Sequence, residues 1–209
     1  MKNYLELESW PRREHYEFFR KFDEPFFGAT VTVDCTRAYT VSKERRYSYF
    51  LYYLHKTLLA ANAVPAFKYR ISGEKVIIHE VIHGSATIGR EDGSFGFSLI
   101  EFDPDFDHFA KKALVEIERV KKASGLFTRS FDEDNLIHFS ALPWVNFTSL
   151  SHARNYALAD SCPKISFGKM LSDAAGDKSM SMSVHVHHAL MDGLHVGEFI
   201  DCFQQQMNL

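Results

Sequence analysis

The chain has 209 residues, 45% of them hydrophobic and 14% aromatic, and a formal net charge of −3 at pH 7. This composition is typical of a packed globular protein and excludes an intrinsically disordered chain. The scattered basic residues predict no nucleic-acid partner, and the lack of a long apolar run or apolar leader predicts neither a membrane span nor a signal peptide.

The cysteines and the chain length limit the class of protein further. Cys35, Cys162 and Cys202 are an odd number at distant spacings, which fits no disulfide framework and indicates a reducing, cytoplasmic location. No repeat or flexible linker divides the chain, so we expect residues 1–209 to form a single domain.

The first half of the chain predicts helices and strands in mixed order. A short helix with aromatic residues on one side is expected from Arg12 to Phe22, and an alternating pattern predicts a strand from Ala29 to Cys35. One long helix with a wide apolar face is expected from Thr40 to Val64. A pair of strands follows between Ala66 and Ile82, and a further strand from Ser94 to Phe102.

The second half of the chain also predicts helices and strands in mixed order. A helix from Asp103 to Gly125 opens on acidic residues and closes on lysines and glycine, as the helix dipole and C-cap preferences favour. Strands are expected at Leu136 to Leu142, Lys164 to Leu171 and Met180 to His188, before an amphipathic helix from His195 to Met207. Without strict strand and helix alternation, this order predicts an α/β sandwich with a mixed or antiparallel sheet and helices packed on it.

The stretch from Ser181 to Phe199 contains four histidines. Because side chains alternate along a strand, His188 ends an apolar row while His185 and His187 point to the other face. A partly buried imidazole favours its neutral, proton-accepting form. Asp192 lies in an expected turn, where its carboxylate can brace the strand end. The pattern therefore predicts His188 as a positioned general base.

Two other interpretations of these histidines remain. His185 and His187 on one strand face, with His195 nearby, have acceptable spacing for zinc. A third and fourth ligand are not obvious and no Cys or Glu cluster lies near, so we predict no metal. In the other interpretation, these three are structural histidines with satisfied hydrogen bonds.

Three motifs resemble a known family. Residues 187–193 spell H-H-x-x-x-D-G, which resembles the signature shared by chloramphenicol acetyltransferases and the catalytic domains of dihydrolipoamide acyltransferases. "WPRREHYEFF" from Trp10 to Phe19 and "ALPWVNFTS" from Ala141 to Ser149 resemble the chloramphenicol enzymes in particular. The resemblance covers essentially the whole chain, and the lack of a preceding lipoyl-type domain or flexible linker disfavours the dihydrolipoamide group.

The resemblance implies the two-layer sandwich of CoA-dependent acyltransferases and the transfer of an acetyl group to a hydroxyl of chloramphenicol. Acetyl-CoA is the implied co-substrate, and His188 the base, without an acyl-enzyme. Ser149 would hydrogen-bond the developing oxyanion. Asp192 would pair with Arg12 in an ion pair that steadies the histidine.

The resemblance also implies contacts with both substrates. Ser166 stands in "PKISFGK" where the family usually has Thr, and would hold a transition-state water; Lys169 would lie near the CoA phosphates. Phe19 and Phe97 are expected in the acceptor site, with an aromatic supply that also includes Phe26, Phe27 and Phe139. The segment from Leu150 to Cys162 is poorer in aromatic residues than the corresponding stretch of the family, which puts the identity of the acceptor in doubt.

The implied assembly is a cytoplasmic homotrimer with each active site between subunits. Its implied partners are the acceptor and acetyl-CoA, with no nucleic acid and no membrane, and its implied role is antibiotic resistance. Two alternatives remain: an acyl-CoA-dependent transferase with another hydroxyl or thiol acceptor, and a catalytically silent CoA-binding oligomeric module. The intact set of His188, Ser149, Asp192 and Arg12 argues against the silent module.

Overall fold

A computed structural model describes residues 3–131, 134–155 and 160–209. The strands are β1 Asn3–Tyr4, β2 Phe26–Asp34, β3 Tyr69–Ser72, β4 Lys75–Ile78, β5 His83–Gly89, β6 Phe95–Phe97, β7 Leu136–Ala141, β8 Lys164–Phe167, β9 Leu171–Ser172 and β10 Lys178–His187. The helices are α1 Arg13–Phe19, α2 Thr36–Glu44, α3 Tyr49–Ala63, α4 Phe106–Lys122 and α5 Gly193–Met207, with a 3-10 helix at Pro65–Lys68. None of the helices among these residues is long and apolar enough to cross a membrane.

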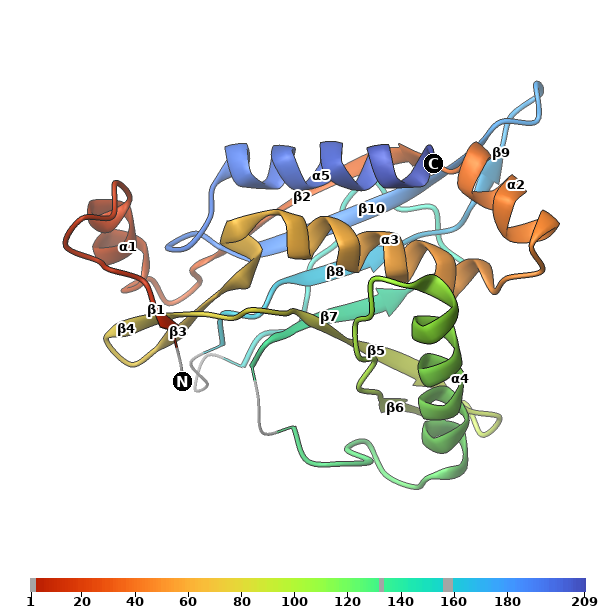
Figure 1. Ribbon diagram of the computed structural model, residues 1–209, viewed down its shortest axis with the longest axis horizontal. Helices are drawn as coiled ribbons and strands as arrows, with labels where there is room; N and C mark the ends of the chain where they lie inside the picture. The colour runs from red at the N-terminus through yellow and green to blue at the C-terminus, as the bar shows by residue number, and fades with distance from the viewer. Residues whose placement is uncertain (1–2, 132–133, 156–159) are drawn as a thin grey trace.

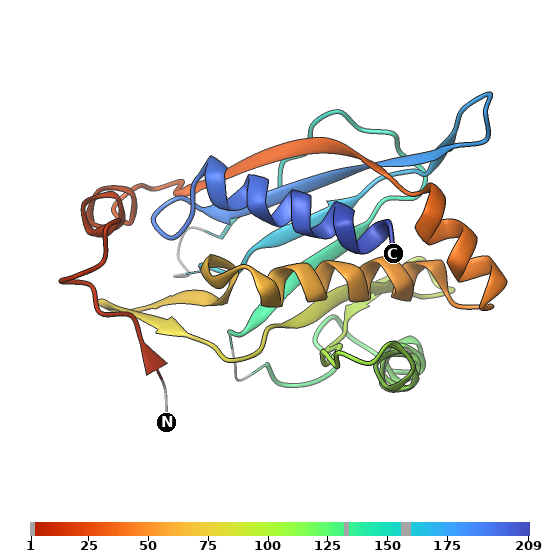
Figure 2. The same ribbon diagram turned by 45° about the horizontal axis from the view of Figure 1, so that its top comes forward.

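The predicted α/β sandwich with a mixed sheet is confirmed. The large sheet has the strand order β2-β10-β8-β7-β5-β6, with β9 beside β10, and β1, β4 and β3 form a small separate sheet. β7 runs parallel to both β5 and β8, whereas β10 is antiparallel to β2 and β8. Helices α3 and α5 lie side by side on one face of the large sheet (Figures 1 and 2).

Alternation along β10 separates the two faces of the sheet. Met182, Val184 and Val186 are fully buried and join the core beneath α3 and α5. Ser181 and His185 point to the opposite face, where the hydroxyl of Ser181 donates a 2.5 Å hydrogen bond to the carbonyl oxygen of Phe147. The part of the connection after β7 that the structure describes, residues 142–155, therefore lies over the face without helices and behind the sheet in Figure 1.

The single long helix expected from Thr40 to Val64 is wrong. Helix α2 ends at Glu44, and Arg46 adopts a left-handed backbone conformation with φ of 59°. Helix α3 then begins after Ser48, whose side chain accepts from the backbone N–H of Leu51. The break contains neither Gly nor Pro, so no breaker residue signals it in the sequence.

Strand β5 was not predicted, although it lies between β6 and β7. It is composed mainly of small residues, and Thr87 and Ile88 are its only residues of the β-branched and aromatic types that favour strands. Its Gly84 allows a close approach, because a Cβ there would lie 3.1 Å from the ring of Phe139. The strand expected from Ser94 to Phe102 is correspondingly shorter and is β6.

Candidate active site

His188 is the first residue after β10, so the strand ends one residue earlier than expected. Its backbone N–H donates to the carbonyl oxygen of Pro25 at 2.8 Å. Its imidazole stacks on Phe19 of α1, with ring centroids 3.8 Å apart and planes 9° apart, and contacts Phe27 of β2 at 4.6 Å. Phe27 lies opposite Val186, so the ring is at the end of the helix-covered face, as the alternation predicted.

A backbone carbonyl orients the His188 ring. The Nδ1 atom of His188 lies 3.2 Å from the carbonyl oxygen of Met191. Because a carbonyl oxygen only accepts, this hydrogen bond assigns the proton to Nδ1 and leaves the lone pair on Nε2. The ring is thus held in the tautomer that a base acting through Nε2 requires.

An ion pair lies next to this turn. The Nη1 atom of Arg12 contacts Oδ2 of Asp192, and the Nη2 atom donates to the carbonyl oxygen of His188 at 3.3 Å. The Arg12 side chain is 13% exposed and that of Asp192 33%. One guanidinium therefore holds both the carboxylate and the backbone that carries His188.

Asp192 is also the N-cap residue of α5. Its Oδ1 atom accepts from the backbone N–H of Leu194 at 3.0 Å and lies 2.8 Å from Nδ1 of His195. Partial burial alone would raise the pKa of Asp192, but the hydrogen bond from His195 and the charge of Arg12 more than offset it and lower that pKa. The carboxylate is therefore ionised at neutral pH and remains paired.

Ser149, Ser166 and Lys169 lie away from His188. Ser149 is exposed in the connection that covers the face without helices. Ser166 is buried in β8 with its hydroxyl 3.4 Å from Nε2 of His152, and Lys169 is exposed with its backbone N–H bonded to Val145. Within one chain, the structure does not bring Ser149 to His188, because the segment that carries Ser149 lies on the face without helices and the His188 ring is at the end of the other face.

Two neighbouring cavities open on the face without helices. The first has a volume of about 310 Å³, and its lining residues include Phe97, Phe139 and His138. The second, of about 210 Å³, contains Gly28 and Arg154, and the two cavities share His152 and Lys164. Phe97 thus lines a cavity, and Phe19 packs on His188.

The polar residues of these cavities were missed by the sequence analysis. Burial lowers the pKa of His138 to about 4, with a further contribution from the charge of Lys164. Burial and the proximity of His185 likewise lower the pKa of His152 to about 4. Both rings are neutral at pH 7. The one available signal was the alternation within β7, which places His138 and Ser140 on the same face.

The histidines considered for zinc each have hydrogen bonds of their own. His185 Nδ1 lies 3.3 Å from the hydroxyl of Ser183, His187 Nδ1 accepts from Ala189, and His195 pairs with Asp192. Within the described ranges, no group of three or more His, Cys, Asp or Glu residues is arranged to hold a metal ion.

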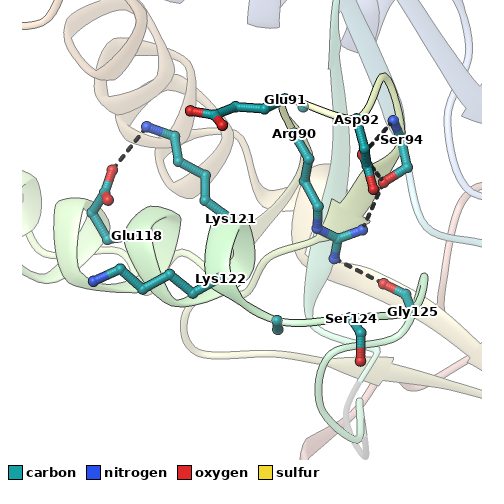
Figure 3. A pocket seen from close by; sticks show the side chains of 11 residues that line it. Arg90, Glu91, Asp92, Ser94, Glu118, Lys121, Lys122, Ser124 and Gly125 are labelled. Atoms are coloured by element: carbon teal, nitrogen blue, oxygen red, sulfur yellow. Dashed lines mark hydrogen bonds and ion pairs between the residues drawn. The ribbon is translucent and has the colours of Figure 1, made fainter.

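Another hollow, of about 830 Å³, lies between the end of β5 and the end of α4 (Figure 3). Arg90 extends into it and donates to the carbonyl oxygens of Val120 at 3.1 Å and Gly125 at 2.8 Å. Lys121 pairs with Glu118 at 2.8 Å. The guanidinium thus binds carbonyl groups at the end of α4, and we assign this hollow a structural role.

The sandwich, with the partly buried His188 at the end of β10 and the Arg12–Asp192 pair beside it, defines an acyltransferase of the H-H-x-x-x-D-G type. The family model described as "Chloramphenicol acetyltransferase" matches residues 2–204, and the chain belongs to this family. The predicted family and the assignment as an acyltransferase are confirmed.

Individual relatives match along nearly their whole length. Chloramphenicol acetyltransferase 3 of Escherichia coli is 29% identical over 207 residues, covering 98% of this chain and 96% of the relative. A chloramphenicol acetyltransferase of Bacillus pumilus is 26% identical over 195 residues, covering 93% and 88%.

Solved structures of related proteins have the same fold as this chain. A chloramphenicol acetyltransferase superposes with a TM-score of 0.90 at 28% identity, covering 99% of this chain and all of that one. A truncated catalytic core of the 2-oxoacid dehydrogenase multienzyme complex from Thermoplasma acidophilum has a TM-score of 0.69 at 15% identity, covering 94% of both chains, and shares the fold.

Proposed function

We propose that this chain transfers an acetyl group from acetyl-CoA to a hydroxyl group of chloramphenicol, with His188 as the general base. The observation that carries this proposal is the His188 ring, stacked on Phe19 and held through Nδ1 by Met191, within the family motif. The family membership of the chain supports the donor and the acceptor.

In the proposed reaction, Nε2 of His188 takes the proton of the acceptor hydroxyl while that oxygen attacks the thioester carbonyl carbon. The tetrahedral intermediate then collapses, the carbon–sulfur bond breaks, and the CoA thiolate receives the proton from His188. No acyl-enzyme forms. Ser149 donates a hydrogen bond to the oxyanion, and loss of one such donor typically costs about 10² to 10³ in rate. Arg12 and Asp192 position the turn that carries the base.

We further propose a homotrimer in which His188 of one subunit faces Ser149 of its neighbour. The location of the two side chains on opposite faces of one sheet supports this arrangement, since a site containing both then needs two chains. Phe97 and Ser166 would belong to the acceptor side of the neighbour, with Ser166 holding a water. Lys169 is exposed, which suits a contact with the CoA phosphates.

Residues 1–209 would form one cytoplasmic domain that needs no metal and binds neither nucleic acid nor membrane, with antibiotic resistance as its role. All three cysteines are free thiols, in keeping with a reducing compartment. The polar lining of the two cavities favours a second candidate function, transfer to a different hydroxyl or thiol acceptor.

The test of the reaction follows the release of free CoA thiol from acetyl-CoA with chloramphenicol as the acceptor. The His188→Ala variant serves as the blank, and a panel of other alcohols and thiols serves as the comparison. We expect drug-dependent release by the wild type. Release with another acceptor but none with chloramphenicol would retain the chemistry and reject the acceptor.

Mixed assemblies test the shared site. The His188→Ala and Ser149→Ala variants are unfolded together, refolded together and assayed. If each site draws the two side chains from different chains, random mixing leaves about a quarter of the sites intact. If both side chains come from one chain, no site is intact and no activity returns.

A further inference from the structure

Arg154 lines the 210 Å³ cavity on the face without helices. Its guanidinium carbon lies 3.4 Å from the ring centroid of Phe26, and its side chain is only 12% exposed. This stacking on an aromatic ring fixes the plane of the guanidinium without using any of its N–H groups.

Two nitrogens of this guanidinium lack hydrogen-bond partners. Nε lies 3.6 Å from a carboxylate oxygen of Glu24, and Nη1 lies 3.5 Å from one of Asp160. Neither contact is a hydrogen bond, so each nitrogen is buried and faces a carboxylate without a hydrogen-bond partner. Because an unsatisfied buried N–H is costly, above all on a charged group, these two nitrogens fit a ligand that supplies oxygen acceptors.

The neighbouring side chains of the cavity already have partners. Nζ of Lys164 lies 2.5 Å from a carboxylate oxygen of Asp160 and 3.2 Å from the carbonyl oxygen of Cys162. His152 lies 3.4 Å from the hydroxyl of Ser166. Of the three side chains Arg154, Lys164 and His152, only Arg154 has buried nitrogens without a hydrogen-bond partner.

Gly28 makes room in the second cavity. A Cβ atom at this position would lie 2.3 Å from Nε2 of His185, so the absence of a side chain lets the His185 ring lie across β2. His152 and Lys164 line both cavities, so the cavity at Phe97 and the cavity at Arg154 adjoin at these two side chains.

We propose that Arg154 determines acceptor specificity by donating hydrogen bonds to a planar two-oxygen substituent of the acceptor, a nitro or a carboxylate group. The inference rests on the proposed function and deepens it. Chloramphenicol, a nitrophenyl compound, belongs to the class that this site would recognise. The aromatic part of the acceptor would lie in the cavity that Phe97 lines.

The test compares three acceptors: chloramphenicol, its analogue with hydrogen in place of the nitro group, and its analogue with a carboxylate there. Dissociation constants are measured by calorimetry without acetyl-CoA, and kcat and KM with it. The variants are Arg154→Met, which removes the donors, and Arg154→Lys, which keeps the charge. Arg129→Met is the matched control, because Arg129 is exposed and lies 3.6 Å from Glu116 on α4.

We expect Arg154→Met to weaken binding of chloramphenicol by about 10-fold to 100-fold, the usual effect of losing a hydrogen bond to a charged group. Binding of the carboxylate analogue should fall further, and that of the hydrogen analogue by less than about twofold. Arg154→Lys should restore the carboxylate analogue better than the nitro compound, since it keeps the point charge but not the planar fork. KM for acetyl-CoA should not change, and Arg129→Met should have no effect.

Equal losses for all three acceptors would overturn the inference and assign Arg154 a purely structural role. Unchanged binding in Arg154→Met, or no binding of these compounds by the wild type, would also overturn it. If the wild type binds the compounds with the expected group dependence but releases no CoA, the proposed function fails and the role of Arg154 stands. If CoA is released but binding does not depend on the substituent of the acceptor, the proposed function stands and the role of Arg154 is rejected.

Discussion

Arg12 and Asp192 are 180 residues apart in the chain, yet their side chains form an ion pair beside the turn that carries His188. The pair connects the beginning of α1 with the beginning of α5. Arg12 also donates to the carbonyl oxygen of His188. The position of the proposed base therefore depends on contacts between the N-terminal and C-terminal parts of the chain.

Replacing Asp192 by Asn should lower the free energy of unfolding by about 1 to 3 kcal/mol, less than for a fully buried pair because the carboxylate is partly open to water. We also expect kcat to fall by about tenfold, since His188 loses its orientation, with little change in either KM. Urea unfolding and steady-state kinetics measure both effects. Arg12→Met and the double variant complete a cycle, and additive losses would show that the two side chains act independently.

The turnover of the His188→Ala variant should be at least about 10³-fold lower than that of the wild type, while the fold is retained, because the base acts directly in the transition state. Circular dichroism and the CoA-release assay test the two parts. His15→Ala is the matched control, since His15 is an exposed histidine on α1. A folded His188→Ala variant with nearly normal turnover would reject His188 as the base.

Stability should fall as the pH decreases from about 6.5 towards 4. Burial, assisted by nearby charges, lowers the pKa of His138, His152 and His187 to about 4 in the folded chain, so the unfolded chain binds more protons in this interval. Each such histidine contributes up to about 1.4 kcal/mol per pH unit there.

Urea unfolding at several pH values measures this slope. The His152→Gln variant should show a smaller slope than the wild type, while His108→Gln, at an exposed position of α4, should show the same slope. A slope unchanged by His152→Gln would mean that this ring is protonated equally in both states.

The Gly28→Ala variant should disturb acceptor binding through His185. The added Cβ would lie 2.3 Å from the imidazole, so the ring must turn away and lose its contact with the hydroxyl of Ser183. We expect KM for the acceptor to rise several-fold and KM for acetyl-CoA to stay unchanged. Gly197→Ala is the control, because a Cβ at this position of α5 meets no atom within 4 Å. Equal kinetics for the two variants would show that the His185 ring does not shape the cavity.

Light scattering should give a mass about three times the 24.1 kDa of one chain. A mass equal to one chain in dilute solution would remove the proposed site between subunits. A catalytically active monomer would also require Ser149 and His188 to act separately.

Strong local patterns made much of this fold predictable. The alternation in β10 correctly placed His188 on the side of Val186, and the periodicity of the last helix correctly predicted α5. The resemblance supplied Arg12 as the partner of Asp192, which no local pattern contains. Its family assignment was confirmed, whereas the catalytic roles stay predictions.

Other features depend on distant contacts and could not be predicted. The left-handed residue Arg46 has no helix-breaking side chain. β5 has only Thr87 and Ile88 to favour a strand, and its pairing with β6 and β7 depends on distant parts of the chain. The position of Ser149 on the face opposite His188 follows from how the connection after β7 crosses the sheet. The cavity at Arg154 depends on strand register, because Gly28 and His185 are direct partners in β2 and β10.

The pairing of β2 with β10 bears on how the chain is synthesised. β2 lies at the edge of the sheet, and β10 is its partner along its whole length, so that Thr30 contacts Ser183 across 153 residues of sequence. While a ribosome translates the intervening segment, β2 has no strand to pair with. An unpaired apolar strand is prone to intermolecular pairing. Slow translation or a shortage of chaperones during this interval should therefore reduce the yield of folded enzyme without changing the activity of the molecules that do fold.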